Sequence, residues 1–159
     1  MNTSNKIFTK QTILPTLDKW KEEGDVVFTN GCFDLIHLGH VDYLEKARNL
    51  GTRMIVGLNT DASVSRLKGP ERPLVNEYAR ARVMASFAFV DAVILFDEET
   101  PLDLITLLKP DILVKGDDYT AENIVGADIV ITHGGVVKTV ALVQGYSTTN
   151  LVKKIKQYM

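Results

Sequence analysis

Short apolar runs alternate with helical patterns along nearly the whole chain, and this alternation restricts the fold more than any other feature. Five of the runs are short and rich in β-branched residues. They are Asp25–Thr29, Arg53–Leu58, Asp91–Phe96, Asp111–Val114 and Val136–Leu142. Nearly continuous apolar character suits a strand that is covered on both faces. The runs therefore predict five buried strands.

Helical patterns fill the intervals between these runs. The clearest are Gln11–Glu23, Gly39–Leu50, Glu77–Phe89 and Thr100–Leu108. Strands that alternate with helices predict βαβ units, so we expect an α/β fold, a Rossmann-like three-layer sandwich with a mainly parallel five-stranded sheet. Residues 1–159 are expected to form a single domain, of which residues 1–10 are flexible.

Ligands of such sheets bind beyond the carboxyl ends of the strands, where the strand order reverses. That rule places the expected site just after Thr29, near Asn59 and near Lys115.

The composition excludes several classes of protein. Hydrophobic residues make up 45% of the 159 residues, and the formal net charge is -2. This charge argues against broad nucleic-acid binding. Cys32 is the single cysteine, which excludes an intrachain disulfide and a cysteine-based zinc site and agrees with a reducing compartment. We find no apolar stretch of signal-peptide type and no membrane span, so a cytoplasmic location without membrane contact is expected.

The segment that follows the first predicted strand has the features of an anion site. It runs from Thr29 to His40 and opens the next helix. Gly31 permits close backbone approach to a ligand, and Gly39 has no side chain to block a phosphate. The start of the helix adds free N–H groups and a positive dipole end. Together these features predict phosphate binding.

His37 and His40 are the catalytic candidates. They are three residues apart, so they lie near one another if they share the first helical turn. Either imidazole can donate a hydrogen bond to a phosphate oxygen. Two alternatives stay open, ordinary structural histidines and a zinc pair, although His133 is far away in sequence. No P-loop and no G-x-G-x-x-G motif is present, and nothing supplies a base that would make Cys32 a nucleophile.

These residues carry a family resemblance. The sequences NGCFD, at residues 30–34, and HLGH, at residues 37–40, resemble the GxFDxxHxGH signature of the cytidylyltransferase-like nucleotidyltransferases. The resemblance implies a Rossmann-like fold and transfer of a nucleotidyl group with release of pyrophosphate. It also implies that both histidines contact the triphosphate and stabilise the pentacoordinate α-phosphorus. The nucleotide-binding residues that it implies here are Asn30, Gly31, Cys32, Phe33 and Gly39.

A second anion site is predicted near the C-terminus. Gly145–Asn150 precedes an amphipathic tail, Leu151–Tyr158. A Ser/Thr run before a helix supplies capping side chains and free amides. By itself this run also suits an ordinary helix cap. In the family that it resembles, a similar Ser/Thr motif grips the β- and γ-phosphates, which implies nucleotide contacts from Tyr146, Ser147, Thr148 and Thr149.

The middle of the chain narrows the substrate. The order of its segments resembles the nucleotidyltransferase domain of ADP-heptose synthases, over about Phe28 to Ile155. That resemblance implies transfer of AMP from ATP to D-glycero-β-D-manno-heptose 1-phosphate, on the route to the lipopolysaccharide core. One departure is the KGDDY sequence of residues 115–119, where heptose enzymes read KGGDY. Glycerol-3-phosphate cytidylyltransferases have a GDDW-like segment there. They also have an arginine-containing RTEG-like stretch, which is absent at Leu142–Gly145.

Substrate contacts are expected from six further residues. Lys115 ends a predicted strand and offers an ammonium to a phosphate. The carboxylates of Asp34 and Asp118 can accept hydrogen bonds from sugar hydroxyls. Arg48, two turns beyond His40, could face the phosphates, as a basic residue does in the related cytidylyltransferases. Each of these charges has an alternative as a solvated surface group. The substrate candidates are Asp34, Asn59, Arg66, Arg80, Lys115 and Asp118, and Arg48 joins the nucleotide candidates.

The expected reaction is a direct in-line displacement. The phosphate nucleophile is already ionised at neutral pH, so no general base is required. Mg²⁺ is expected to enter with ATP, held mostly by phosphates and water, without a resident metal site. A homodimer is usual among the relatives. The rivals are an enzyme that uses CTP and glycerol 3-phosphate, a nucleotide-binding regulatory module without catalysis, and a fragment of a tRNA synthetase.

Overall fold

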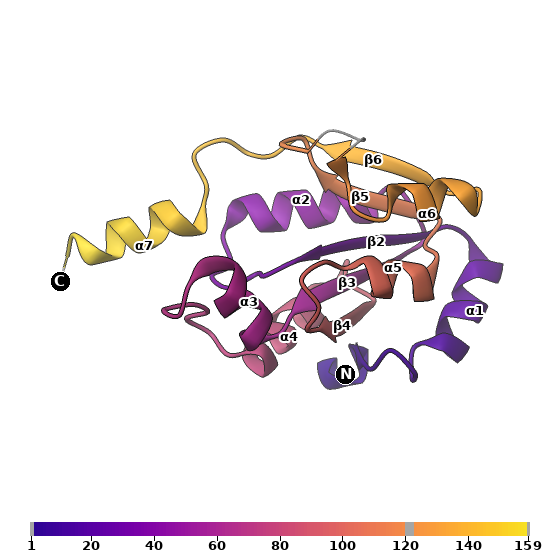
Figure 1. Cartoon of the computed structure of the whole chain (residues 1–159), viewed down its shortest axis with the longest axis horizontal. Coiled ribbons are helices and arrows are strands. Elements are labelled where there is room, and N and C mark those ends of the chain that lie inside the picture. The colour runs from indigo at the N-terminus through magenta and orange to yellow at the C-terminus, as the bar shows by residue number, and fades with distance from the viewer. Residues whose placement is uncertain (1, 120–122, 159) are drawn as a thin grey trace.

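The computed structural model describes residues 2–119 and 123–158. Its strands are β1 (Ile7–Phe8), β2 (Val26–Gly31), β3 (Arg53–Asn59), β4 (Ala92–Phe96), β5 (Ile112–Gly116) and β6 (Val136–Val140). Its helices are the 3₁₀ turn η1 (Thr3–Lys6), α1 (Leu14–Glu23), α2 (Leu38–Arg48), α3 (Asp61–Lys68), α4 (Glu77–Ser86), α5 (Leu102–Leu108), α6 (Ala127–Thr132) and α7 (Thr148–Lys156). Figure 1 shows the sheet with helices on both sides.

The strands form one sheet in the order β1-β4-β3-β2-β5-β6, and the strand pairs of the described residues are all parallel. The α/β class and the parallel sheet are therefore confirmed. The prediction of five strands was wrong by one, because the sheet has six. The additional strand, β1, pairs with β4 and lies within residues 1–10. Its two residues are too few to produce a sequence pattern.

Two short helices were also missed. α3 has eight residues and α6 has six. Each is too short to show a clear apolar periodicity. α3 begins where Thr60 caps the amide of Ser63, and this local cap is the signal that the sequence does contain.

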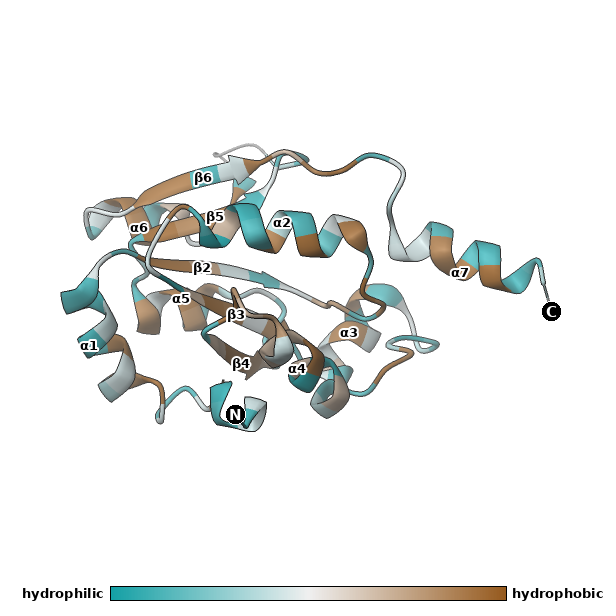
Figure 2. Cartoon of the chain, turned by 180° about the vertical axis from the view of Figure 1, so that it is seen from behind, coloured by the Kyte–Doolittle hydropathy of each residue, from teal (hydrophilic) through white to brown (hydrophobic). Residues whose placement is uncertain are grey.

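Alternate residues of each strand point to opposite faces, so the sheet separates two hydrophobic clusters. Val27 and Val56 lie in one cluster, with α2 and α4 packed over them. Val26 and Ile55 lie in the other, under α1, α5 and α6. Figure 2 shows the hydrophobic colouring of the central strands, as burial on both faces requires. No helix of the described residues is long and apolar enough to cross a membrane.

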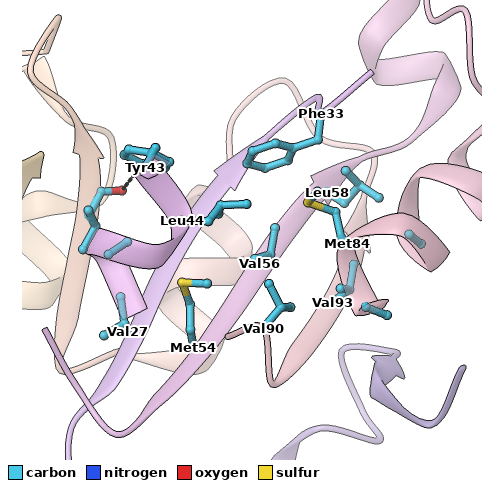
Figure 3. Close-up of a cluster of buried hydrophobic side chains, with 14 of the residues drawn as sticks. Val27, Phe33, Tyr43, Leu44, Met54, Val56, Leu58, Met84, Val90 and Val93 are labelled. Atoms are coloured by element: carbon cyan, nitrogen blue, oxygen red, sulfur yellow. Dashed lines mark hydrogen bonds between the residues drawn. The ribbon is translucent and has the colours of Figure 1, made fainter. Parts of the chain in front are cut away.

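Tyr43 of α2 anchors this helix to two strands. Figure 3 shows its ring and Leu44 in the cluster between α2 and the sheet. The Tyr43 hydroxyl lies 2.7 Å from Oγ1 of buried Thr29 and donates to the carbonyl oxygen of Val114 at 3.0 Å. These residues belong to β2 and β5. One hydroxyl thus fixes α2 relative to β2 and β5, two adjacent strands that lead to the expected site.

The substitution Tyr43→Phe should lower the free energy of unfolding by about 1–3 kcal/mol. It removes both hydrogen bonds and leaves the buried Thr29 hydroxyl and the Val114 carbonyl without that partner. Urea denaturation measures the change. Tyr158→Phe is the matched control, since Tyr158 is 81% exposed. An unchanged unfolding midpoint for Tyr43→Phe would show that the hydroxyl does not hold α2.

Candidate active site

A large cavity lies at the carboxyl ends of the central strands. Its volume is about 970 Å³. Asn30, Asn59 and Lys115, from the ends of β2, β3 and β5, line it together with the start of α2 and the segment before α7. The site therefore lies at the switch point of the parallel sheet, where it was expected. All of the predicted site residues line this cavity except Arg48, Arg66 and Arg80.

The two histidines form a stacked pair at the start of α2. Their ring centroids are 3.8 Å apart and the rings are inclined by 22°. His37 is the N-cap residue of α2, in an extended backbone conformation, and His40 lies in the first turn. Nδ1 of each ring is shielded and bonds to no other described residue. Both histidines line the cavity.

Burial favours the neutral form of both imidazoles in the free protein. Burial lowers the pKa of His40 to about 4, and the positive charges of His37 and Lys68 act in the same direction. Burial also lowers the pKa of His37. A neutral imidazole still has one N–H to donate, and an anion next to the rings would favour their protonation.

The backbone before the histidines is shaped by Phe33. Its φ of 44° lies in the left-handed region, which is uncommon for a residue with a side chain. The Phe33 ring packs edge-on against His40 with centroids 5.3 Å apart. A Cβ on Gly31 would lie 2.9 Å from this ring. Glycine at position 31 therefore leaves room for the Phe33 ring that packs against His40.

The C-terminal Ser/Thr segment meets the histidine loop. A Cβ on Gly39 would lie 3.4 Å from Cβ of Tyr146 and 3.1 Å from the His37 ring. Thr148 donates its hydroxyl to the carbonyl oxygen of Leu35 at 3.4 Å across 113 residues of sequence. Ser147 caps α7 by accepting from the amide of Asn150 at 3.1 Å. Two helix N-termini, those of α2 and α7, thus border one cavity, as the sequence predicted.

Lys115 supplies a desolvated ammonium to the same cavity. Its Nζ donates to Oδ1 of Asn30 and lies 5.5 Å from the centre of the Tyr119 ring. Burial lowers the pKa of Lys115 to about 8, partly offset by the carboxylate of Asp118. A phosphate beside Nζ would stabilise the charged form of the lysine.

Comparison with known proteins identifies the family. The model that describes cytidylyltransferase-like proteins matches residues 28–154, which include the histidine loop and the Ser/Thr segment. This chain belongs to the cytidylyltransferase-like family.

Relatives and solved structures agree with this family. The bifunctional protein HldE of Magnetococcus marinus is 62% identical over 138 residues, which are 86% of this chain and 28% of that protein. The HldE of Syntrophotalea carbinolica is 53% identical over 95% of this chain and 31% of its own length. This chain therefore spans less than a third of these two relatives. A lipopolysaccharide core biosynthesis protein from Thermoplasma volcanium has a TM-score of 0.61 at 29% identity, covering 78% of this chain and 99% of that one.

Pantoate-beta-alanine ligase from Francisella tularensis shares the fold alone, with a TM-score of 0.59 at 12% identity over 96% of this chain and 77% of that one.

Arg48 does not line the cavity. This corrects the expectation that Arg48 contacts the phosphates of the nucleotide. It lies in the last turn of α2, whereas His40 lies in the first. Its Nε donates to Oδ2 of Asp91 at 3.0 Å, and its NH1 donates to the carbonyl oxygen of Gly51 at 2.6 Å. The length of α2 thus places Arg48 at the opposite end of the helix from the histidine pair.

Arg80 was also misassigned as a substrate contact. Its side chain is fully buried, and its guanidinium donates to the carbonyl oxygens of Cys32 and Val75 and to Oδ1 of Asp61. It connects three segments around the site without reaching the cavity. Arg66 lies outside the main cavity, and its guanidinium binds the side chain and carbonyl oxygen of Asp97.

Asp34 lines the cavity, but its oxygens are already bound. It accepts from Arg72 and from the amides of Leu74 and Val75, with distances of 2.6–2.9 Å. Burial alone would raise the pKa of this carboxyl, but these hydrogen bonds outweigh it and lower the pKa. Asp34 therefore holds the loop before α4 and is not free to accept sugar hydroxyls.

Asn59 and Cys32 occupy the wall between β2 and β3. Asn59 donates to Oγ of Ser63 at 2.9 Å and accepts from the Cys32 thiol at 3.8 Å. Burial raises the pKa of Cys32, so this thiol is not an activated nucleophile. That agrees with the sequence, in which nothing supplies a base that would make Cys32 a nucleophile.

Sequence reasoning missed two cations of the cavity. Lys68, at the end of α3, and Arg72, in the next loop, both line it. Lys68 is two residues beyond Arg66, which was chosen instead, and without the helix bounds nothing in the sequence separates them. The apolar wall formed by Val125, Leu142 and Val143 was missed as well.

Titration of the free protein should place the pKa of His40 at about 4, and saturation with ATP should raise it. Burial, His37 and Lys68 disfavour the protonated ring, whereas a triphosphate favours it. NMR of the imidazole signals against pH measures both values. His133, which does not line the cavity, is the internal control. If saturating ATP does not change the pKa of His40, the triphosphate does not bind next to the histidine pair.

Proposed function

We propose that this domain is an adenylyltransferase that transfers AMP from ATP to D-glycero-β-D-manno-heptose 1-phosphate, giving ADP-heptose and pyrophosphate for lipopolysaccharide core biosynthesis. The supporting observation is that His37 and His40 border one cavity with the Ser147–Thr149 segment. The resemblance to the nucleotidyltransferase domain of ADP-heptose synthases and the similarity to HldE proteins support the substrate.

The chemistry is a single in-line substitution at the α-phosphorus. An oxygen of the sugar phosphate forms the new P–O bond, and the bond between the α-phosphorus and the bridging oxygen breaks. The electron pair of the broken bond leaves with pyrophosphate, so no base and no oxidant are needed. The roles left to the protein are to position the reactants and to stabilise charge.

The residues divide this work by position. The imidazoles at the start of α2 donate to the oxygens around the α-phosphorus, where charge builds up. The free amides and hydroxyls at the start of α7 hold the leaving pyrophosphate. The ammonium groups of Lys115 and Lys68 neutralise phosphate charge from two sides of the cavity.

The two ends of the cavity suit different groups. At the β5–β6 end the wall is apolar, with Val125, Leu142 and Val143, and a flat base suits it. At the β3–β4 end stand Lys68 and Arg72, which suit the phosphate of the second substrate. The histidine pair lies between these ends, at the carboxyl end of β2.

Mg²⁺ is proposed to enter as the ATP complex. Within residues 2–119 and 123–158, no three His, Cys, Asp or Glu side chains gather as a metal site. Asp118 lines the cavity, and its carboxylate could bind a water of the ion's hydration shell. Bound there, Mg²⁺ would neutralise phosphate charge.

A reaction of CTP with glycerol 3-phosphate is the second candidate, favoured by the GDDY sequence at residues 116–119. Leu142–Gly145 lacks the arginine of those enzymes, which weighs against this second candidate.

A cytoplasmic location is proposed together with the function, since ATP is available there.

The substitution His40→Ala should lower the rate of pyrophosphate release from ATP and heptose 1-phosphate by about 10²–10³-fold, because it removes a donor to the transition state. Arg48→Gln is the control, since Arg48 lies outside the cavity, and its rate should stay near that of the parent protein. A coupled pyrophosphate assay measures both. Full turnover by His40→Ala would contradict the assigned role.

We also propose that the domain acts as a homodimer through α7. Figure 1 shows α7 extending from the body, and none of its side chains is buried. Leu151 and Ile155, at 37% and 51% exposure, lie on one face. A helix of nine residues is marginal in water without packing. A second copy would supply that packing.

Light scattering after gel filtration should give twice the 17.7 kDa mass of one chain. Ile155→Asp should shift the mass toward a single chain, whereas Lys153→Gln should not. A monomeric parent protein would contradict the dimer.

A further inference from the structure

A second cavity adjoins the active-site cavity at its β3–β4 end. Its volume is about 230 Å³, and it is lined by Ser63, Arg66, Leu67, Glu99 and Thr100. Leu67, Glu99 and Thr100 also line the main cavity, so these three residues form the boundary between the two spaces. A ligand part that projects beyond them enters the smaller space.

The walls of this second cavity are fixed by hydrogen bonds between α3 and the loop after β4. The Thr60 hydroxyl bonds to the side chain of Asp97. The Arg66 guanidinium bonds to the carboxylate and to the backbone carbonyl oxygen of Asp97. Ser63 donates to the carbonyl oxygen of Glu98 at 3.4 Å. These bonds hold α3 and the loop after β4 together, so the second cavity has defined walls.

Two neighbouring carboxylates of this loop differ in their bonding. Glu98 forms an ion pair with Lys10 and accepts from the amide of Asp97. Glu99 takes part in none of the hydrogen bonds or ion pairs among the described residues, and it faces both cavities. A free carboxylate accepts hydrogen bonds from hydroxyl groups and repels phosphate. Of the parts of a sugar phosphate, the neutral hydroxyl-bearing part is therefore the one that suits Glu99.

We propose that the second cavity is the subsite for the hydroxyl-bearing tail of the sugar phosphate, and that Glu99 selects for that tail. This inference rests on the proposed function and adds the part of the substrate that is recognised. The phosphate lies toward Lys68 and Arg72, and the sugar extends from there toward Glu99. A two-carbon diol tail, at roughly 30 Å³ per water-sized heavy atom, fits the second cavity. The site accordingly prefers a heptose 1-phosphate to a hexose 1-phosphate.

The test compares kcat/KM for a heptose 1-phosphate with that for the matching hexose 1-phosphate, which lacks the seventh carbon. Glu99→Gln should reduce the preference for the heptose by about 10-fold, because the hydroxyl then donates to a neutral amide oxygen, which is a weaker acceptor than a carboxylate. Its KM for ATP should stay unchanged. Glu98→Gln is the matched control and should keep the preference, since Glu98 lines neither cavity.

A second variant tests the space itself. Thr100→Phe narrows the second cavity and should reduce activity with the heptose while activity with the hexose remains. The subsite proposal would be overturned if both variants keep the heptose preference of the parent protein. It would also be overturned if Glu99→Gln changes only the KM for ATP.

Failure of the proposed function has a different signature. In that case the parent protein releases pyrophosphate with neither sugar phosphate. Calorimetric titration with heptose 1-phosphate then decides the subsite: weaker binding by Glu99→Gln than by Glu98→Gln supports it, and equal or absent binding overturns it.

Discussion

The central position of β2 in a wholly parallel sheet is the constraint on which the site depends. Because β2 pairs with β3 on one side and β5 on the other, the carboxyl ends of three strands meet at one edge. Asn30, Asn59 and Lys115 are placed together by this pairing alone. The Tyr43 hydroxyl then fixes α2 against β2 and β5. Because the histidine pair lies at the start of α2, this contact also helps to position the histidines.

Charged groups around the cavity fall into two kinds. Arg80 and Asp34 are buried and fully bonded, so they hold the surrounding loops in place. His40 and Lys115 are partly desolvated and face the cavity, and their pKa values of about 4 and about 8 reflect the cost of charge without a nearby anion. A bound triphosphate would offset that cost. The free site is thus electrostatically prepared for a polyanion.

The sequence predicted the features that depend on local pattern. The parallel α/β class, the central strands and the two segments that border the cavity follow from periodicity, glycines and capping residues. It did not predict β1, whose two residues gain their strand character only by pairing with β4. It also misassigned Arg48 and Arg80, because a charged side chain near a motif gives no sign of the direction in which it points. Arg48 turns to Asp91 and Arg80 to Asp61.

The same limit hid Lys68, Arg72 and Glu99. Each lies in or beside a segment whose path across the sheet is set by α3 and by the loop after β4. Their convergence is a property of the folded chain and of the bonds that connect those segments.

The account rests on one triphosphate being held from both ends of the chain. A crystal structure with a non-hydrolysable ATP analogue tests this directly. The account predicts phosphate oxygens within hydrogen-bond distance of His37 or His40 and, in the same molecule, of Ser147, Thr148 or Thr149. An analogue bound at only one of these segments, with its phosphates away from the other, would contradict it.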